Sequence, residues 1–275
     1  MAHLHRFYVP PDTVGADSAV GCTITLSGRE AHHACHVVRV RPGEDVILLD
    51  GCGRELSGVV LPHSPFQEAA PGCQVEIRGD LRHPVPSCRL TLIPGWLNRE
   101  KLTEDLIRRV TEIGVSSIRF FKACHSERTP QIKEKWTQIA IEACKQCGNP
   151  RLPVFEAASS LSDALDSLPL AEDPTDPAPR DRATDPPRLL LVATNRVAPV
   201  PLRRVLQEAG LPAGHAEVGL IVGPEGDLSG EELELAFQRG AVPVSFGPRT
   251  FRSEVAASLA CALVLYELGS LGPLG

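Results

Sequence analysis

The chain has 275 residues, of which 43% are hydrophobic and 23% charged, and its formal net charge is −6. This size can bury the core of one large domain or of two smaller ones. No apolar run is long enough to span a bilayer, and the first residues, MAHLHRF, lack the pattern of a secretory signal. We therefore expect a cytoplasmic protein with no membrane partner.

Cysteine usage predicts reduced thiols and no metal site. The chain holds nine cysteines, and without an export signal these are expected to stay reduced. The only CxxC is Cys144–Cys147, and no second ligand pair stands at a spacing typical of zinc sites. A second cluster of histidine and cysteine residues lies within one short helical stretch. We expect these side chains to pack on helix faces and not to bind a metal ion. The cluster comprises His32, His33, Cys35 and His36.

The first eighty residues have the pattern of a small β-barrel. Short β-branched and apolar runs alternate with turn signals such as Asp50–Gly53, and one helix is predicted over Glu30–Val38. Several short strands at close spacing are typical of such barrels, and we place this first domain at residues 1–82. The predicted strands cover residues 22–26, 45–49, 57–61 and 74–78.

From residue 88 onward, predicted strands and helices alternate, which favours a parallel sheet with crossover helices in a second domain at 88–275. Residues 171–188 are rich in Asp, Pro and Ala, and this composition predicts a disordered insertion. The strands are predicted at 88–93, 115–121, 189–193, 217–222 and 242–246, and the helices at 99–113, 132–147, 229–240 and 253–268.

Two apolar strands of this second domain end in Gly-Pro turns, at Gly223-Pro224 and at Gly247-Pro248. Proline fixes φ, and glycine lets the backbone approach a ligand closely. Placed side by side, the two turns would form a cradle of backbone groups suited to a flat, uncharged ring such as adenine. Ligands of open α/β sheets bind at the carboxyl ends of strands, where Thr194 also lies. Three ionised residues follow at the mouth of this cradle: Arg249, Arg252 and Glu254.

Known nucleotide and nucleophile motifs do not explain this site. The chain has no G-x-G-x-x-G after a strand, no P-loop and no Gly-x-Ser-x-Gly elbow. The segments Gly223–Gly226, Gly247–Arg249 and Arg252–Glu254, before an Ala-rich helix, resemble the knotted methyltransferases of the SPOUT superfamily. More narrowly, they are similar to the family that methylates N3 of a uridine in 16S ribosomal RNA. Further segments match this family in order, at 6–9, 36–43, 112–115, 126–128 and 142–148.

The resemblance implies a PUA-like RNA-binding barrel followed by an α/β domain with a deep trefoil knot, acting as a homodimer. It also implies S-adenosylmethionine as the cofactor and 16S ribosomal RNA in the small ribosomal subunit as the partner. The implied cofactor-binding residues are Thr194, Val222, Gly223, Pro224, Glu225, Gly226, Phe246, Gly247, Pro248 and Phe251. The expected RNA-binding residues are Arg6, Arg39, Arg41, Arg109, Arg128 and Lys145.

The chemistry of uridine suggests catalytic residues. N3 is an imide nitrogen that must lose its proton before or during attack on the sulfonium methyl, and the developing anion spreads onto O2 and O4. A guanidinium beside these oxygens would stabilise the transition state, and we expect Arg252 or Arg249 in this position. Glu254 would orient the arginine or accept the proton.

The chain departs from the family pattern at four positions. Asp227 and Val255 stand where Gly and Thr are usual, Lys145 replaces an acidic residue, and Asn149 replaces an arginine. Two alternatives remain open. The nearest is a related knotted enzyme that methylates a ribose 2′-hydroxyl. The other is an RNA-binding assembly factor that has lost catalysis, which the departures at Asp227 and Val255 keep open.

Overall fold

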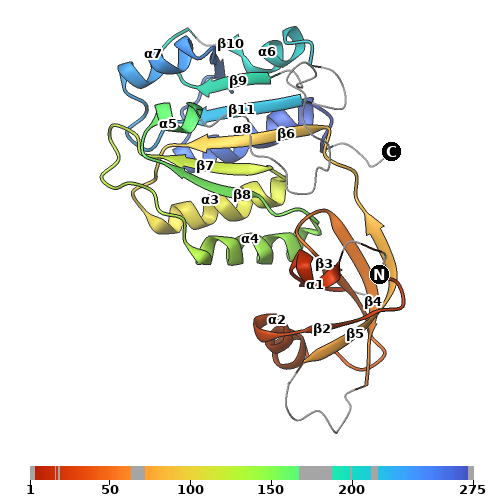
Figure 1. The fold of residues 1–275 in the computed structure, drawn as a ribbon. Helices are drawn as coiled ribbons and strands as arrows, with labels where there is room; N and C mark the ends of the chain where they lie inside the picture. Colours follow the sequence, from red (N-terminus) through yellow and green to blue (C-terminus); the bar gives the residue numbers. More distant parts are fainter. Residues whose placement is uncertain are drawn as a thin grey trace. The chain divides into compact units, whose positions relative to one another are not determined.

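A computed structural model describes residues 4–15, 17, 19–62, 72–166, 188–198, 200–211 and 216–271. The chain folds into two compact units (Figure 1). Unit 1 comprises Met1–Val85 and Ile141–Leu152, and unit 2 comprises Pro86–Ala140 and Pro153–Gly275. The predicted insertion at 171–188 lies outside the described residues, except for Arg188, which begins a strand.

Unit 1 is built on a five-stranded sheet in the order β1-β3-β4-β5-β2. Strand β1 pairs parallel with β3, and the other pairs are antiparallel. The strands are β1 His5–Tyr8, β2 Thr23–Leu26, β3 Asp45–Leu49, β4 Arg54–Val60 and β5 Cys73–Arg82. The helical segments are α1 Pro11–Val14, α2 Gly28–His32 and the π-helix η1 His33–Val38.

The core of unit 1 forms because apolar side chains of these strands point to the same side. Phe7, Leu26, Leu48 and Leu56 are all buried in one cluster. The four predicted strands are confirmed, although β4 begins three residues earlier and β5 runs four residues further than expected. Strand β1 was not foreseen, because its pairing depends on β3, some forty residues away in the sequence.

The predicted helix over residues 30–38 is present, but it changes type along its length. It begins as α-helix at Gly28 and continues as π-helix from His33 to Val38. It ends at Arg39, whose φ of 60° lies in the left-handed region. A left-handed residue commonly ends a helix, although glycine is the usual choice there.

A buried ion pair ties three segments of unit 1 together. Arg54 Nε donates to Asp80 Oδ1 at 2.8 Å, and Arg54 Nη2 lies 2.6 Å from Asp80 Oδ2. Arg54 Nη1 also donates to the carbonyl oxygen of Gly15 at 2.7 Å. Both charged side chains are buried. The hydrogen bonds from Arg54 lower the pKa of Asp80 to about 2 from its ordinary 3.8, so this carboxylate stays ionised in the folded protein.

Unit 2 is built on a seven-stranded sheet in the order β10-β12-β9-β11-β6-β7-β8, and every pair in it is parallel. Its strands are β6 Cys88–Pro94, β7 Ser117–Phe121, β8 Val154–Ala158, β9 Arg188–Ala193, β10 Val200–Pro201, β11 Ala216–Val222 and β12 Val242–Ser245. Its helices are α3 Glu100–Ile113, α5 Leu161–Asp166, α6 Leu202–Glu208, α7 Gly230–Gln238 and α8 Ser253–Glu267, while α4 Glu134–Cys147 starts in unit 2 and ends in the part of the chain assigned to unit 1.

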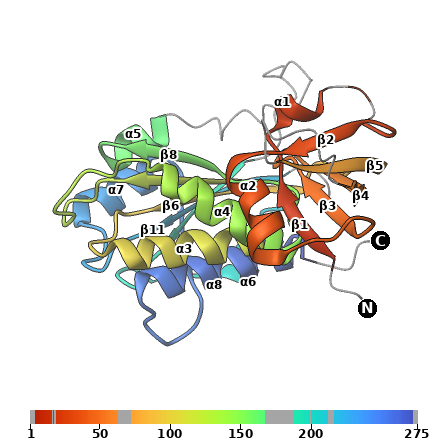
Figure 2. The same ribbon diagram turned by 90° about the horizontal axis from the view of Figure 1, so that it is seen from below.

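Helices cover both faces of this sheet. Figure 2 shows α3, α6 and α8 on one side and α5 on the other. Leu161 of α5 and Leu233 of α7 share a core cluster with Ile93, Val192 and Ile221 of the sheet. All seven residues of β11 are buried, as expected for a central parallel strand covered on both faces.

Most of the predicted elements of unit 2 are confirmed, with ends that differ by one or two residues. The capping box of α7 is present, since Ser229 Oγ accepts from Glu232 N at 3.1 Å and Ser229 N donates to Glu232 Oε2 at 2.8 Å. Helix α3 ends at Gly114, which has the expected left-handed conformation. The short elements β8, α5, β10 and α6 were not predicted, because two to seven residues show little periodicity.

The α/β architecture with a small N-terminal β domain is thus confirmed, while the trefoil knot implied by the resemblance stays a prediction. Within the described ranges, none of the helices combines the length and the apolarity that a bilayer span requires.

Candidate active site

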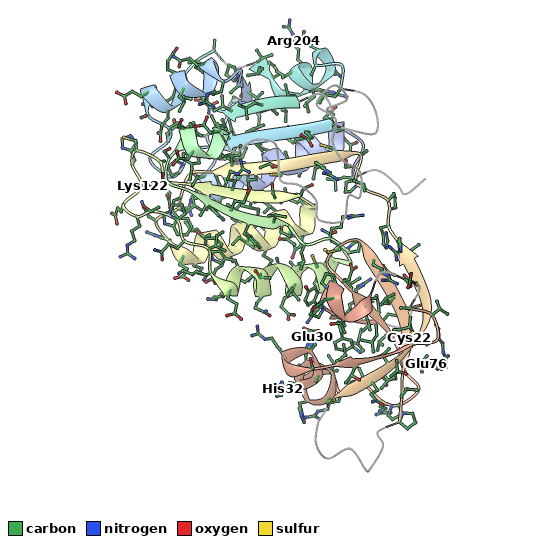
Figure 3. All side chains as sticks on the ribbon, viewed as in Figure 1. Cys22, Glu30, His32, Glu76, Lys122 and Arg204 are labelled. Carbon is green, nitrogen blue, oxygen red and sulfur yellow. The ribbon has the colours of Figure 1, made fainter. Side chains whose placement is uncertain are left out.

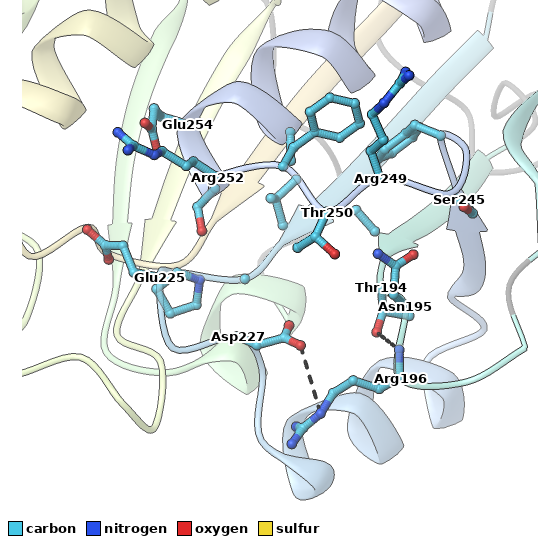
Figure 4. Close-up of a pocket in the computed structure, with 18 of the residues that line it drawn as sticks. Thr194, Asn195, Arg196, Glu225, Asp227, Ser245, Arg249, Thr250, Arg252 and Glu254 are labelled. Carbon is cyan, nitrogen blue, oxygen red and sulfur yellow. Dashed lines mark hydrogen bonds and ion pairs between the residues drawn. The ribbon is translucent and has the colours of Figure 1, made fainter.

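An open pocket of about 790 Å³ lies at the carboxyl ends of β9, β11 and β12 (Figure 4). All three predicted catalytic residues line it, namely Arg249, Arg252 and Glu254. Eight of the ten predicted cofactor-binding residues also line it: Thr194, Val222, Gly223, Pro224, Glu225, Phe246, Gly247 and Phe251. Residues from three separate strand ends therefore meet in one hollow.

The sequence analysis placed the two Gly-Pro turns side by side, but in the structure they are separated. Strand β9 lies between β11 and β12 in the sheet. Its last residue, Ala193, is in register with Val222 of β11 and next to Val244 of β12. Thr194, which follows β9, therefore stands between the two turns. The expectation was wrong on this point because β11 and β12 are consecutive in the sequence, and strands that are consecutive in the sequence need not be neighbours in a parallel sheet.

The other two predicted cofactor-binding residues, Gly226 and Pro248, are not among the residues that line the pocket. Gly226 instead packs against another loop: a Cβ added to it would lie 3.0 Å from the Cβ of His125. Pro248 is exposed. Glycine at 226 is thus explained by packing of the turn against the 122–133 loop.

Several pocket residues were missed by the sequence analysis. Asn98 and Arg99 come from the connection between β6 and α3, and Leu102 comes from the first turn of α3. A signal for them exists, because β6 also ends in a Pro-Gly turn, at Pro94-Gly95, before a helix. The remaining ones follow strand ends or neighbour predicted residues, and they are Ala193, Asn195, Arg196, Asp227, Val244, Ser245, Thr250, Ser253 and Ala256.

The turn after β11 is closed tightly over Gly223. Asp227 N donates to the carbonyl oxygen of Pro224 at 2.9 Å. A Cβ on Gly223 would lie 3.0 Å from Leu228 N, which is closer than side chains are normally found. Glu225 reaches the opposite wall, where its Oε1 accepts from Asn98 N at 3.3 Å. Glycine at 223 is thus required by the close approach of the turn to itself.

The turn after β12 depends on Gly247 in a different way. Its φ of 115° is a conformation that residues with a Cβ rarely adopt. Ser245 Oγ accepts from Gly247 N at 3.2 Å and thereby holds the turn. Together these features keep backbone groups of residues 245–247 at the surface of the pocket.

The charged residues of the pocket differ sharply in their exposure. Arg249 and Arg252 are exposed, and Arg252 is the N-cap residue of α8. Glu254, in the first turn of α8, is only 5% exposed. Its Oε2 has no hydrogen-bond partner within the part of the chain that the structure describes. A buried carboxylate oxygen without a donor is unfavourable, so Glu254 presents an unused acceptor at the pocket.

The predicted RNA-binding residues fall in both units. Arg109 on α3 and Arg128 in the 122–133 loop are exposed in unit 2. In unit 1, Arg39 and Arg41 are exposed, whereas Arg6 is half-buried and its Nη1 donates to the carbonyl oxygen of Lys145 at 3.4 Å. The four exposed arginines are free to meet an RNA phosphate, and an RNA contact for them stays a prediction.

Lys145 does not fit its predicted function. Its Nζ lies 2.9 Å from Glu30 Oε1 and 2.9 Å from Glu142 Oε1, and its side chain is buried (Glu30 is labelled in Figure 3). All three residues belong to unit 1. Lys145 is therefore an internal ion-pair partner and not the exposed RNA contact that the sequence suggested. Glu142 lies three residues before Lys145 on the same helix, but Glu30 is 115 residues away in the sequence, so local pattern could not reveal that Lys145 is buried between two acids.

Gly95 offers a test of how tightly the pocket wall is packed. A Cβ on Gly95 would lie 2.5 Å from Pro224 Cδ and 2.8 Å from Pro224 N. We expect Gly95→Ala to lower the free energy of unfolding by about 1–3 kcal/mol, because overpacking of this size shifts the backbone. The shift would also move Pro224 and weaken cofactor binding. Denaturant unfolding measures the loss of stability, and calorimetric titration measures the loss of affinity.

Gly230→Ala is the matched control, since a Cβ there would meet no atom within 4 Å. It should leave stability unchanged or raise it slightly, because alanine favours a helix over glycine. If the two variants have the same free energy of unfolding, the close approach of residue 95 to Pro224 does not affect stability.

Among the described residues, no group of three or more His, Cys, Asp or Glu side chains could hold a metal ion. The histidines and the cysteine near residue 33 belong to the helical segment of unit 1, where His32 and His36 stack with ring centroids 5.0 Å apart.

Fold and site together define an α/β enzyme domain that binds its ligand at the carboxyl ends of parallel strands, joined to a small β domain. The family profile described as "RNA methyltransferase domain" matches residues 84–265, and the one described as "RNA methyltransferase PUA domain" matches residues 26–61. The chain belongs to this RNA methyltransferase family.

Similar proteins extend over nearly the whole chain. "Ribosomal RNA small subunit methyltransferase E" of Synechocystis sp. is 27% identical over 267 residues, covering 94% of this chain and 77% of the relative. The protein of the same name from Mycobacterium tuberculosis is 28% identical over 268 residues, covering 94% and 90%. The crystal structure of ribosomal RNA small subunit methyltransferase E from Neisseria gonorrhoeae, bound to S-adenosyl methionine, has the same fold. Its TM-score is 0.73 at 23% identity, covering 96% of this chain and 98% of that one.

Proposed function

We propose that this enzyme transfers the methyl group of S-adenosylmethionine to N3 of a uridine in 16S ribosomal RNA of the small subunit. The relatives that extend over the chain are named as small-subunit ribosomal RNA methyltransferases, and a protein of the same fold binds S-adenosylmethionine. The observation that carries the proposal is the pocket itself. It brings the buried Glu254, whose Oε2 has no hydrogen-bond partner among the described residues, together with two exposed guanidinium groups, Arg249 and Arg252.

The pocket fits a nucleoside-containing cofactor. Gly223 and Gly247 keep backbone amide and carbonyl groups near its surface, and Thr194 is a buried polar residue between them. Phe246 and Phe251 add half-buried aromatic surface. When bound, the cofactor supplies an electrophilic methyl group on a sulfonium. The residues that would hold it are therefore those of the three turns after β9, β11 and β12.

The charged residues of the chain suit the uridine. Its N3 proton must leave while the N–C bond forms and the C–S bond breaks, and the unused Oε2 of Glu254 is an acceptor in the pocket. The guanidinium of Arg252 or Arg249 would hold the negative charge that develops on O2 and O4. Positioning of the ring by the pocket walls would supply much of the remaining acceleration.

The decisive experiment is transfer of a labelled methyl group from S-adenosylmethionine to small ribosomal subunits from a strain that lacks the modification. Nucleoside mass spectrometry of the product should find the label on the uracil base at N3. Label on the ribose would instead identify a 2′-hydroxyl methyltransferase. RNA binding with no transfer, and no heat on titration with millimolar cofactor, would identify an assembly factor without catalysis.

Glu254→Gln tests the proton acceptor. The amide keeps the size of the side chain but cannot accept the N3 proton, and general-base groups typically contribute about 100-fold or more. We expect turnover to fall by about 100-fold, with cofactor affinity within twofold of wild type, measured by methyl transfer at saturating substrate.

The control is Glu267→Gln on the same helix, which removes a carboxylate that lies 3.4 Å from Arg203 outside the pocket. It should leave turnover unchanged. If Glu254→Gln also keeps full turnover, the proton goes elsewhere, for instance directly to water.

The proposed enzyme works as a homodimer. Helix α8 supports this, because apolar residues at helical spacing form a stripe on one of its faces: Val255, Leu259, Ala262, Leu263 and Tyr266. Tyr266 is 67% exposed and Val255 is 38% exposed, so part of this stripe is open to a second copy. The molar mass of the protein in solution tests the assembly.

In the proposed reaction each unit, taken by itself, offers exposed arginines to the RNA. The PUA-matched segment of unit 1 includes the exposed residues Arg39 and Arg41, and unit 2 adds Arg109 and Arg128. Arginine makes bidentate contacts with phosphate. Because small ribosomal subunits are the substrate, the proposed location is the cytoplasm.

A further inference from the structure

Asp227 occupies an unusual position in the wall of the pocket. Its φ is 61°, and among the described residues only Arg39 is another non-glycine residue with positive φ. Aspartate is tolerated in this left-handed region, but glycine is strongly favoured there. The preceding residue, Gly226, is not left-handed, and it is required because a Cβ would approach His125. The turn therefore places an aspartate at the position where glycine would be least strained.

The side chain of Asp227 is held in one orientation by its neighbours. Its Oδ1 accepts from Leu228 N at 2.8 Å, and its Oδ2 lies 3.8 Å from Arg196 Nε (Figure 4). Arg196 is itself anchored, since its Nη1 donates to the carbonyl oxygen of Leu228 and its backbone N donates to Thr194 Oγ1 at 3.1 Å. The pair thus joins the turn after β11 to the turn after β9.

This arrangement leaves one acceptor for a ligand. Oδ2 is beyond hydrogen-bond distance from Arg196, and Asp227 is half-exposed and lines the pocket. Because Arg196 balances the charge of the carboxylate, Asp227 is better suited to a neutral hydroxyl donor than to a second cation. The neutral hydroxyl donors of a nucleoside are on its ribose, and carboxylates commonly accept from them.

We propose that Asp227, oriented by Arg196, determines cofactor specificity by accepting a hydrogen bond from a ribose hydroxyl of S-adenosylmethionine. The inference rests on the proposed function, because it takes the pocket to be the cofactor site. It adds a carboxylate contact to the turn backbone, the buried Thr194 and the aromatic side chains already assigned to the cofactor.

The test is calorimetric titration of the full chain with S-adenosylhomocysteine and with its 2′-deoxy and 3′-deoxy analogues. The variant Asp227→Asn keeps the acceptor for Leu228 N and tolerates the left-handed conformation. We expect it to bind S-adenosylhomocysteine about 10-fold more weakly than wild type. Removing the contacted hydroxyl should weaken wild type by about 10-fold but should leave the variant almost unaffected.

Glu208→Gln is the matched control. It replaces the carboxylate of another arginine pair, in which Arg204 Nε lies 2.7 Å from Glu208 Oε1 on the surface of α6 (Arg204 is labelled in Figure 3). Its affinity for all three ligands should equal that of wild type. Asp227→Gly, which favours the same backbone conformation, provides a second variant should Asp227→Asn fold poorly, and the Tm of each variant reports its folding.

Two results would overturn the inference. In one, Asp227→Asn binds S-adenosylhomocysteine as tightly as wild type. In the other, the variant remains as sensitive as wild type to the loss of each hydroxyl, so that Asp227 acts only on the shape of the turn. Wild type that binds neither S-adenosylmethionine nor S-adenosylhomocysteine would contradict the proposed cofactor itself, and this outcome is distinct from the other two.

Discussion

Replacement of Arg252 by alanine should lower the turnover of methyl transfer by about 100- to 1000-fold, the range found when one donor to a developing oxyanion is removed. Arg252 is exposed, lines the pocket and lies at the N-cap of α8. A cation there opposes the helix dipole, so the stability of the helix does not explain its presence. Single-turnover transfer to small subunits measures the effect, and calorimetric titration should show cofactor affinity within twofold of wild type.

The control for this variant is Arg204→Ala, which removes an exposed arginine of α6 outside the pocket. Its turnover should equal that of wild type. If Arg252→Ala keeps the turnover of wild type, Arg249, the other predicted catalytic arginine, stabilises the developing negative charge instead. A large loss of cofactor affinity with normal turnover would place Arg252 in cofactor binding instead.

The second large effect is expected on stability, in unit 1. Asp80→Asn leaves the buried guanidinium of Arg54 without its negative partner. Breaking a buried pair in this way typically costs about 3–5 kcal/mol, so we expect unit 1 to lose about 3 kcal/mol of its free energy of unfolding. Calorimetry of the full chain and hydrogen exchange of the amides of β5 measure the loss.

The matched control is Glu76→Gln on the same strand. Glu76 Oε2 lies 3.7 Å from Arg78 Nη2 in an exposed pair, and such pairs contribute about 1 kcal/mol or less. Equal losses for the two variants would show that burial adds nothing to the importance of the Arg54–Asp80 pair.

The same ion pair predicts a pH dependence. The pKa of Asp80 is about 2 in the folded protein and 3.8 ordinarily. A lowered pKa contributes stability that is fully present above pH 4 and is lost as the pH falls toward 2, because protonation then favours the unfolded chain. The wild type should therefore lose more stability than Asp80→Asn between pH 4 and pH 2.

Much of unit 2 could be predicted because its signals are local. The capping box at Ser229 and Glu232 and the glycine stop at Gly114 involve only neighbouring residues, and both are present. The site was also largely predictable, since Gly-Pro turns at strand ends mark the places where a ligand can approach backbone groups. Asn98 and Arg99 were missed because the same kind of turn at Pro94-Gly95 was not recognised as a third example.

Local sequence properties thus determined the strands, the helices, the turns and the identity of the charged residues at the pocket. Tertiary structure decided which of these meet. It placed β9 between the two Gly-Pro turns, buried Lys145 between Glu30 and Glu142, and left Glu254 with an unused oxygen. The physical reason is that periodicity and turn geometry depend on residues close in the chain. The neighbours of a strand and the solvation of a charge depend on segments that come together only on folding.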